Sequence, residues 1–221
     1  MLTIEESRNR ILRRAYAELE TGSVVNLGVG LPTALANLID EDRSIHIHSE
    51  NGILGVGPSP RSAEDSDPAL INAGKQPVTL TPGGSFFDSA TSFAMIRGGH
   101  IDVAVIGALQ IDESGILANW LVPGENVLGV GGAMDLVTGA KRVLVVTTHC
   151  TKSGAPKIVK ECTYPITATR PVDTIITERA LFRRTGDGLQ LAELGDGFSL
   201  ESIYDSTDAE FEVSENIPVF A

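Results

Sequence analysis

Two segments of the sequence, "IDVAVIGAL" at 101–109 and "RVLVVTT" at 142–148, contain uninterrupted apolar runs, and these runs constrain the fold most. A strand with one face in water alternates apolar and polar residues, whereas a fully apolar run is typical of a strand covered on both faces. Such strands belong to parallel sheets, whose crossover connections place helices on both sides. The sequence therefore predicts an α/β fold with an open, mostly parallel sheet flanked by helices.

Other parts of the chain fit this alternation of strands and helices. Strands are predicted at 23–29, 44–48 and 77–81, and helices near residue 32, near 88–97 and near 133–140. The first helix is the best marked, because Thr3 and Glu6 form a capping box and Gly22 is expected to end it. After residue 171, short strands and a helix near 199–205 predict a small β-rich C-terminal portion that packs onto the same core.

Composition excludes several classes of function. Seventeen basic against 29 acidic residues give a net charge of −12, which would repel a nucleic-acid backbone. No apolar run approaches the roughly 18 residues of a membrane helix, and the charged N-terminus has no targeting signal, so a cytoplasmic protein is expected. No linker or repeat divides the chain, and 1–221 is expected to be a single domain. Cys150 and Cys162 lack zinc-site spacing and are expected to be reduced thiols.

The segment "IHSENGILGVGP" at 47–58 places a carboxylate, Glu50, on a glycine-rich corner at the end of a strand. Asn51 and Gly52 suffice to make a turn, so the turn does not explain the glutamate. Glu50 is either a solvated turn residue or a nucleophile. The tripeptide alone does not decide, because Ser214-Glu215-Asn216 repeats it in an acidic tail without a glycine corner. The acidic stretch 61–69 that follows is predicted to be an exposed loop and a rim for a pocket.

Two glycine clusters each follow a strand or loop and lead into a predicted helix. "NLGVGLPT" at 26–33 lacks the third glycine of a dinucleotide fingerprint, so a tight turn is favoured, with Asn26 able to point its amide into a cleft. "GVGGAMD" at 129–135 is either an anion-binding nest, the geometry that an oxyanion hole needs, or a place of close backbone packing.

Histidine and serine residues give weaker signals. His46 and His48 share one face of a strand and are half of a metal site at most, and without further ligands at suitable spacing packed histidines are favoured. No serine lies in a G-x-S-x-G elbow, so a serine-hydrolase triad is not expected.

Several segments together resemble the B subunit of the 3-oxoacid CoA-transferases, in which Ser-Glu-Asn-Gly is a signature. The resemblance extends from about residue 8 to about residue 205, with the motifs in the same order and at compatible spacing. The segments that carry it are "VNLGVGLPT", "HSENGILGVGP", "LINAGKQPVT", "SFAMIRGGHIDVAVIGALQID", "LANWLVPG" and "GVGGAMDLVTGAK".

The resemblance implies a transferase that moves CoA between two carboxylic acids, with Glu50 as the covalent nucleophile. It also implies that Asn26, Gly131 and Gly132 bind substrate and stabilise oxyanions. Lys75 is implied to contact the CoA phosphates, and without the resemblance its alternative is an ordinary surface lysine. CoA thioesters are then substrates, with no permanently bound cofactor and no metal. The implied partner is the CoA-transferase A subunit, in a heterodimer or heterotetramer, with the acyl site between the two halves.

The resemblance leaves the acyl substrates open. Many relatives have lysine where this chain has Glu125, and an acidic residue where it has Thr148, before His149. "TKSGAPKIVKECTYPIT" resembles the branch that acts on 3-oxoadipate, whereas "LANWLVPG" resembles the acetoacetate branch. Succinyl-CoA or acetyl-CoA with acetoacetate is the leading expectation, 3-oxoadipate is the alternative, and a non-catalytic ligand-binding or regulatory protein is an alternative of another class.

Overall fold

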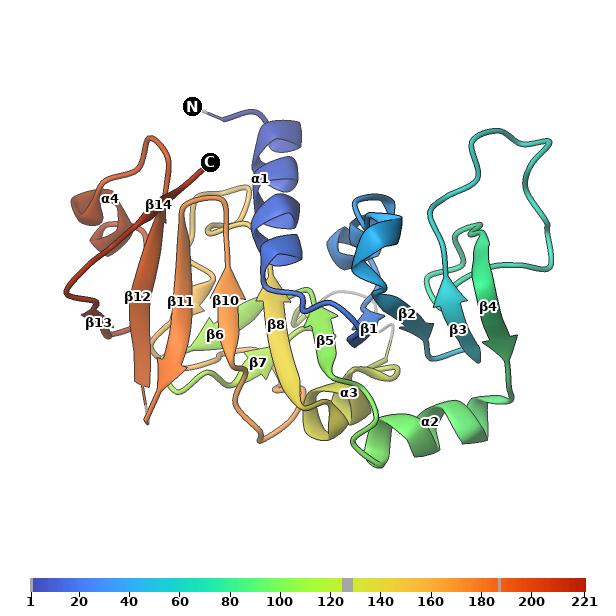
Figure 1. The fold of residues 1–221 in the computed structure, drawn as a ribbon. Helices are drawn as coiled ribbons and strands as arrows, with labels where there is room; N and C mark the ends of the chain where they lie inside the picture. The colour runs from blue at the N-terminus through green and yellow to red at the C-terminus, as the bar shows by residue number, and fades with distance from the viewer. Residues whose placement is uncertain (1, 125–128, 187) are drawn as a thin grey trace.

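The computed structural model describes residues 2–124, 129–186 and 188–221, which form an α/β structure around one large sheet (Figure 1). The helices are α1 (Ile4–Ala17), η1 (Leu31–Asn37), η2 (Glu41–Arg43), α2 (Ser89–Arg97), α3 (Ala133–Gly139) and α4 (Leu200–Tyr204). The strands of the large sheet are β1 (Val24–Leu27), β2 (His46–Ser49), β3 (Ile53–Val56), β4 (Leu80–Phe86), β5 (Val103–Ile106), β8 (Arg142–Val146), β10 (Thr174–Ile176), β11 (Ala180–Thr185), β12 (Gly188–Gly195), β13 (Phe211–Val213) and β14 (Val219–Phe220). A second sheet contains β6 (Gln110–Asp112), β7 (Leu117–Ala118) and β9 (Ile158–Val159).

The centre of the large sheet is parallel, in the order β10-β8-β5-β1-β2. Antiparallel strands extend it on both sides, with β3 and β4 beyond β2 and with β11 and β12 beyond β10. Every residue of β5 is buried, as are the last four residues of β8, which explains why their sequences are uninterrupted apolar runs. The predicted open, mostly parallel sheet is confirmed.

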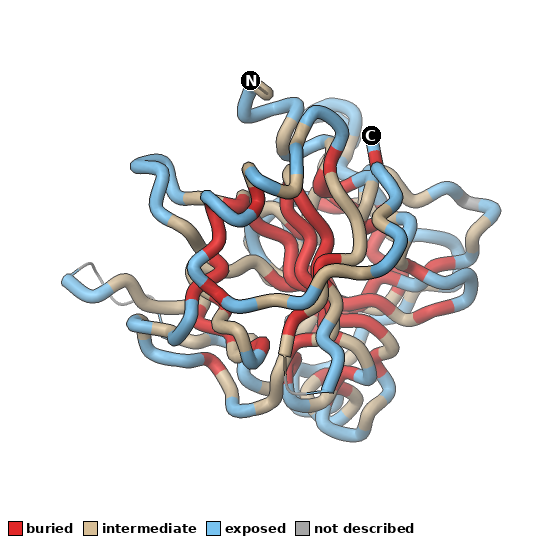
Figure 2. Tube along the Cα trace, turned by 90° about the vertical axis from the view of Figure 1, so that its left-hand side faces the viewer, coloured by how far each residue is buried: buried red, intermediate tan, exposed pale blue. Residues whose placement is uncertain are grey.

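Buried residues gather in the middle of the molecule (Figure 2), and their side chains form two cores, one on each face of the sheet. On one face, the stripe of α1 that contains Ile11, Leu12 and Ala15 packs with Val25 and Ile47 of the first two strands. On the other face, residues of α2, α3, α4 and the small sheet pack against alternate residues of β5 and β8. The two-sided burial follows from the alternation of side chains along each strand.

The segment after residue 171 differs from the prediction. It was expected to form a small β-rich portion packed onto the core, but β10 pairs with β8, and β11 and β12 continue the large sheet. The predicted β content and the helix near 199–205 are confirmed by β10 to β13 and α4. Sequence pattern identifies strands better than it identifies their neighbours, because pairing partners here are distant in sequence.

Three local predictions were also inaccurate. The helix near Pro32 is the 3₁₀ helix η1, and α1 ends at Ala17, with Gly22 in the turn that follows. The strand expected at 77–81 begins only at Leu80, and β3 was not predicted at all. Both β3 and β4 contain glycines, which are depleted in strands, so their sequences lack the usual strand signal.

No helix among the described residues is both long enough and apolar enough to cross a membrane. Cys150 and Cys162, which both lie in the described part of the chain, are free thiols, as expected.

A buried carboxylate attaches α1 to the sheet. The side chain of Glu18, only 8% exposed, accepts hydrogen bonds from Arg14 on α1, Arg142 on β8 and Arg183 on β11, at 2.7 to 3.1 Å. Burial by itself would raise the pKa of Glu18, but the bonds from Arg183 and Arg14 outweigh it and lower the pKa from 4.5 to about 2. Three arginines from three elements meet at this carboxylate, and its loss would leave Arg14 and Arg142 with only their second partners, Glu193 and Glu20.

We predict that Glu18→Gln lowers the free energy of unfolding at pH 7 by roughly 2–4 kcal/mol. A lowered pKa in the folded state stabilises the protein above pH 4.5, and this contribution disappears as the pH falls through about 2. Denaturant titrations of wild type and variant between pH 7 and pH 2 measure the difference. Glu20→Gln is the control, because Glu20 also contacts Arg142 but is 82% exposed, and it should change little. A Glu18→Gln effect that does not shrink at low pH would contradict this account.

Candidate functional site

Glu50 lies in a tight turn between β2 and β3, and glycine is required to close this turn. The N–H of Gly52 donates to the carbonyl of Ser49 at 2.9 Å, and the N–H of Phe87 donates to the carbonyl of Gly52 at 3.0 Å. Gly52 has φ +114°, and a Cβ atom there would overlap the carbonyl oxygen of Phe87. No other residue type fits this conformation and this space, so Gly52 fixes the corner that carries Glu50.

A loop formed by residues 70–78 is attached to both neighbours of Glu50. The N–H of Ala73 donates to Oγ of Ser49 at 3.0 Å, and Nδ2 of Asn51 donates to the carbonyl of Ile71 at 2.8 Å. Lys75 lies on this loop with φ +60°, and its side chain is exposed. The structure therefore brings the Lys75 loop to the Glu50 turn, but among the described residues no contact joins the two side chains.

The carboxylate of Glu50 meets the side chain of Asn26. Asn26 lies on β1 directly opposite His48 of β2 in the parallel register. Its Nδ2 is 3.0 Å from Nδ1 of His48 and 3.4 Å from Oε2 of Glu50. Asn26 and His48 are completely buried, whereas Glu50 is partly exposed, so the carboxylate lies at the exposed edge of a buried polar cluster.

Both ring nitrogens of His48 have hydrogen-bond partners, and an aromatic ring stacks on it. Its Nε2 is 3.0 Å from Oγ of Ser92 on α2, and its ring stacks on Phe87 with 5.9 Å between ring centroids. Burial lowers the pKa of His48 to about 4, so the ring is neutral at pH 7. The other histidine of the pair, His46, is exposed. In the described part of the chain no three His, Cys, Asp or Glu side chains are grouped as metal ligands.

The second glycine cluster reaches Glu50 from α3. Gly132, which precedes the first residue of α3, lies so close that an added Cβ would be 3.6 Å from Cγ of Glu50 and 3.2 Å from the ring of Phe93. Gly131 has φ +56°, with open space around its Cα atom. Neither N–H donates a hydrogen bond to any residue that the structure describes.

The structure thus brings Asn26, Gly132 and Glu50 together from three separate segments. The sequence favoured a packed histidine at position 48 over a metal ligand, but it did not indicate a role beside Glu50 for His48, Ser92 or Phe93. His48 and Glu50 are two residues apart, a spacing that places them on one face of a strand, and that signal was available. Ser92 comes from a helix 44 residues further along the chain, and no local pattern indicates it.

The structure describes only one of the two sites at which the sequence departs from many relatives. Glu125 lies outside the described residues. His149 is buried, with its ring nitrogens 2.9 Å from the hydroxyls of Thr177 and Thr207, and the Thr148 hydroxyl accepts from Nζ of Lys157 at 3.0 Å. Burial lowers the pKa of His149 to about 3 and also lowers the pKa of Lys157. Thr148 and His149 therefore belong to a packed polar cluster after β8.

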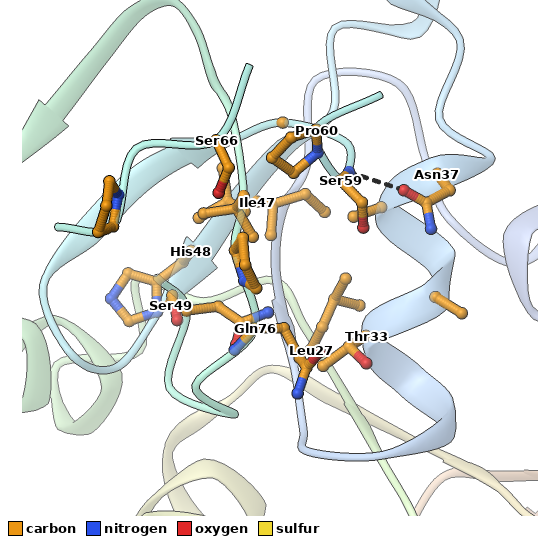
Figure 3. A pocket seen from close by; sticks show the side chains of 18 of the residues that line it. Leu27, Thr33, Asn37, Ile47, His48, Ser49, Ser59, Pro60, Ser66 and Gln76 are labelled. Carbon is orange, nitrogen blue, oxygen red and sulfur yellow. Dashed lines mark hydrogen bonds between the residues drawn. The ribbon is translucent and has the colours of Figure 1, made fainter. Parts of the chain in front are cut away.

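A pocket of about 640 Å³ lies between β2, η1 and residues 57–78 (Figure 3). Ile47, Ser49, Thr33 and Asn37 line it, and Ser59 donates its N–H to Oδ1 of Asn37 across one wall. Ser62, Ala63, Ser66 and Pro68 form part of the rim, which confirms the prediction for the 61–69 loop. Glu50 is not among the lining residues, but His48 and Ser49 are, so the pocket borders the residues next to Glu50.

Comparison with known proteins identifies the family of this chain. A family model described as coenzyme A transferase matches residues 9–206. The B subunit of a probable succinyl-CoA:3-ketoacid coenzyme A transferase from Bacillus subtilis is 47% identical, over 97% of this chain and 99% of its own length. The mitochondrial succinyl-CoA:3-ketoacid coenzyme A transferase 2 of Homo sapiens is 51% identical over 96% of this chain, which spans only 41% of that protein.

The fold also has solved relatives. The apoenzyme of an acyl-CoA transferase, YdiF, from Escherichia coli O157:H7 superimposes with a TM-score of 0.80 over all of this chain and 44% of its own, at 23% identity. That similarity concerns the fold, whereas the family model and the sequence relatives cover nearly the whole chain at high identity. The chain therefore belongs to the coenzyme A transferase family.

Proposed function

We propose that this chain is the B half of a 3-oxoacid CoA-transferase that moves CoA between succinyl-CoA or acetyl-CoA and a 3-oxoacid such as acetoacetate. The observation that carries the proposal is the contact of Glu50 with the neutral amide of Asn26, with Gly132 of the second glycine cluster close to the Glu50 side chain. Among the described residues, no cation pairs with Glu50. A carboxylate that is partly desolvated but not neutralised is suited to act as a nucleophile.

The first half-reaction starts at the thioester carbonyl of the acyl-CoA. An oxygen of Glu50 attacks this carbon, the C–S bond breaks, and the electron pair leaves with CoA as thiolate, which gives a mixed anhydride. The thiolate then attacks Cδ of Glu50, the C–O bond breaks, and the first acid leaves as a carboxylate. The product is a thioester between Glu50 and CoA, and the second acid reverses the same steps. No proton, oxidant or metal is needed for this exchange.

Each attack creates an oxyanion, and the surroundings of Glu50 supply neutral donors for it. The N–H groups of Gly131 and Gly132 are assigned to this role, because Gly132 lies against Glu50 and neither N–H donates to a described residue. Asn26 holds Oε2 of Glu50, which leaves Oε1 for the attack. Glu50 needs no general base, because no proton is transferred in this exchange.

A partner, the A half of the enzyme, is part of the proposal. Glu50 is partly exposed at the edge of its group, and a single chain leaves that side open to solvent. The human relative carries more than twice the length of this chain, and the Bacillus subtilis relative is named as a B subunit. Both facts support an A half that covers the site and completes it, and a complex of the two halves is the form to assay.

We assign acetoacetate as the acceptor acid. The segment 151–167 makes 3-oxoadipate the second candidate. Initial rates of the A/B complex with each acid, at equal succinyl-CoA concentration, decide between them. A kcat/KM for 3-oxoadipate above that for acetoacetate would reverse the assignment and leave the mechanism unchanged.

We predict that acyl-CoA without an acceptor acid converts Glu50 into a CoA adduct. Intact-mass and peptide mass spectrometry of the A/B complex should find the adduct on the peptide that contains Glu50. Glu50→Gln should abolish the adduct and lower kcat by at least ~10⁴-fold, because the nucleophile is removed.

Glu215→Gln is the matched control, since Ser214-Glu215-Asn216 repeats the tripeptide at an exposed position. It should leave the adduct and kcat unchanged. Binding of acyl-CoA without any adduct in wild type would favour a non-catalytic ligand-binding protein instead.

We predict that Gly131→Ala lowers kcat without a proportionate loss of stability. Gly131 and Gly186 have φ +56° and +57°, and both face open space, so alanine costs each about 1 kcal/mol of backbone strain. Relief of that strain turns the peptide units around residue 131 and displaces the donors beside Glu50. Gly186→Ala, in the β11–β12 hairpin, should lose the same stability and keep full activity. Equal kcat in the two variants would exclude the glycine cluster from the reaction.

We predict that Lys75→Gln raises KM for CoA thioesters about 5- to 10-fold and leaves KM for the acceptor acid unchanged. An exposed lysine on the loop beside the Glu50 turn is suited to bind a CoA phosphate. The control is Lys152→Gln, at another exposed lysine, which should change neither constant. A matching increase in both KM values, or in neither, would contradict the assignment.

A further inference from the structure

One fully buried polar side chain beside Glu50 has no part in the reaction described above. His48 contacts neither the substrate side of Glu50 nor the glycine cluster, yet it is completely buried and both ring nitrogens have partners. We propose that His48 is a positioning residue, which holds the amide of Asn26 so that one N–H bond points at Glu50. This inference rests on the proposed role of Glu50 as nucleophile.

The contacts define which ring nitrogen of His48 carries the proton. Nδ1 of His48 faces the amide nitrogen of Asn26, and an amide nitrogen donates hydrogen bonds but does not accept them. Nδ1 is therefore the acceptor and carries no proton. Nε2 carries the proton and donates it to Oγ of Ser92, 3.0 Å away, since a hydroxyl can accept. The structure assigns the neutral Nε2–H tautomer.

The orientation of the Asn26 amide follows from the same contacts. Its two N–H bonds are used by Nδ1 of His48 and by Oε2 of Glu50, whereas Oδ1 has no partner among the described residues. A carboxylate only accepts hydrogen bonds, so a rotated amide would place Oδ1 against the charge of Glu50. Because Oδ1 is not held, His48 is the only described partner besides Glu50 itself that fixes this orientation.

The surroundings of His48 keep the ring in place. Phe87 stacks on it at an interplanar angle of 16°, and Ser92 is completely buried on α2. The start of α2 is capped by Asp88, whose side chain accepts from the N–H of Thr91 at 2.7 Å. A low pKa caused by burial agrees with a neutral ring at pH 7. The chain Ser92–His48–Asn26–Glu50 thus connects the helix to the carboxylate through three directed hydrogen bonds.

This arrangement matters for the rate, not for the binding of acyl-CoA. Asn26 restricts Glu50 to one orientation, with Oε2 held and Oε1 presented, and loss of the acceptor on His48 lets the amide rotate. A misplaced carboxylate slows attack strongly, because the reacting atoms must be aligned. Because the proposed role of His48 is exerted through Asn26, the concentration of acyl-CoA that half-saturates the enzyme should not move.

The test compares two variants of similar size in the A/B complex. His48→Gln retains an acceptor oxygen for the Asn26 amide, whereas His48→Met has the same length and no comparable acceptor. The measured quantity is the maximal single-turnover rate constant for formation of the CoA adduct on Glu50, with its half-saturating acyl-CoA concentration and the Tm of each variant. We expect His48→Met to lower the rate constant about 10- to 100-fold and His48→Gln to stay within about 5-fold of wild type.

A structural role alone would affect both variants alike, so equal rate constants for His48→Gln and His48→Met would overturn the proposal. Absence of the adduct in wild type would instead contradict the proposed function.

Long-range ¹H–¹⁵N NMR of the full chain provides a readout that needs no activity, with His48→Gln used to assign the signals. We expect the proton of His48 on Nε2, and a proton on Nδ1 at pH 7 would overturn the proposal whether or not the variants fold.

Discussion

The register between β1 and β2 is the constraint on which the candidate site depends. Parallel pairing places Asn26 opposite His48, and the alternation of side chains along β2 puts Ile47 and Ser49 on the other face. A shift of one residue would exchange these two sets, so that the core residue Ile47 would replace His48 beside Asn26. The apolar residues Val25 and Ile47, which pack against α1, therefore also fix the polar residues that face Glu50.

The same constraint separates two regions that adjoin the same strand. The pocket of about 640 Å³ lies on the η1 side, whereas the contact between Asn26 and Glu50 lies on the side covered by α2 and α3. The pocket does not single out Glu50, which is not one of its lining residues. Glu50 is defined instead by its surroundings. These are the neutral amide of Asn26, the neutral imidazole of His48 that is hydrogen-bonded to this amide, and the two glycines before α3, whose N–H groups have no acceptor in the described structure. All are suited to orient a carboxylate and to stabilise charge without neutralising it.

Sequence patterns predicted the features that depend on local interactions. The capping box at Thr3, the buried runs of β5 and β8, and the helices near 88–97 and 133–140 are confirmed, because each has a local physical cause. The continuation of the sheet through β10 to β12 was not predicted, since pairing joins segments that are far apart in sequence. Glycine-containing β3 and β4 were missed or misplaced for want of strand-forming residues. At the site, motifs identified Glu50, Asn26 and the glycines, but the contact of His48 with Ser92 depends on the position of α2.

The central claim is that an oxygen of Glu50 forms and breaks a covalent bond in every turnover. It is tested most directly by turnover with a carboxylic acid acceptor labelled with oxygen-18 in ordinary water. Attack of the labelled acid on the Glu50 thioester leaves one of its oxygens on the Glu50 carboxylate when CoA departs with the acyl group. The account predicts that the label accumulates in the peptide that contains Glu50 and in no other peptide. Continued turnover with an unlabelled Glu50 peptide would contradict it.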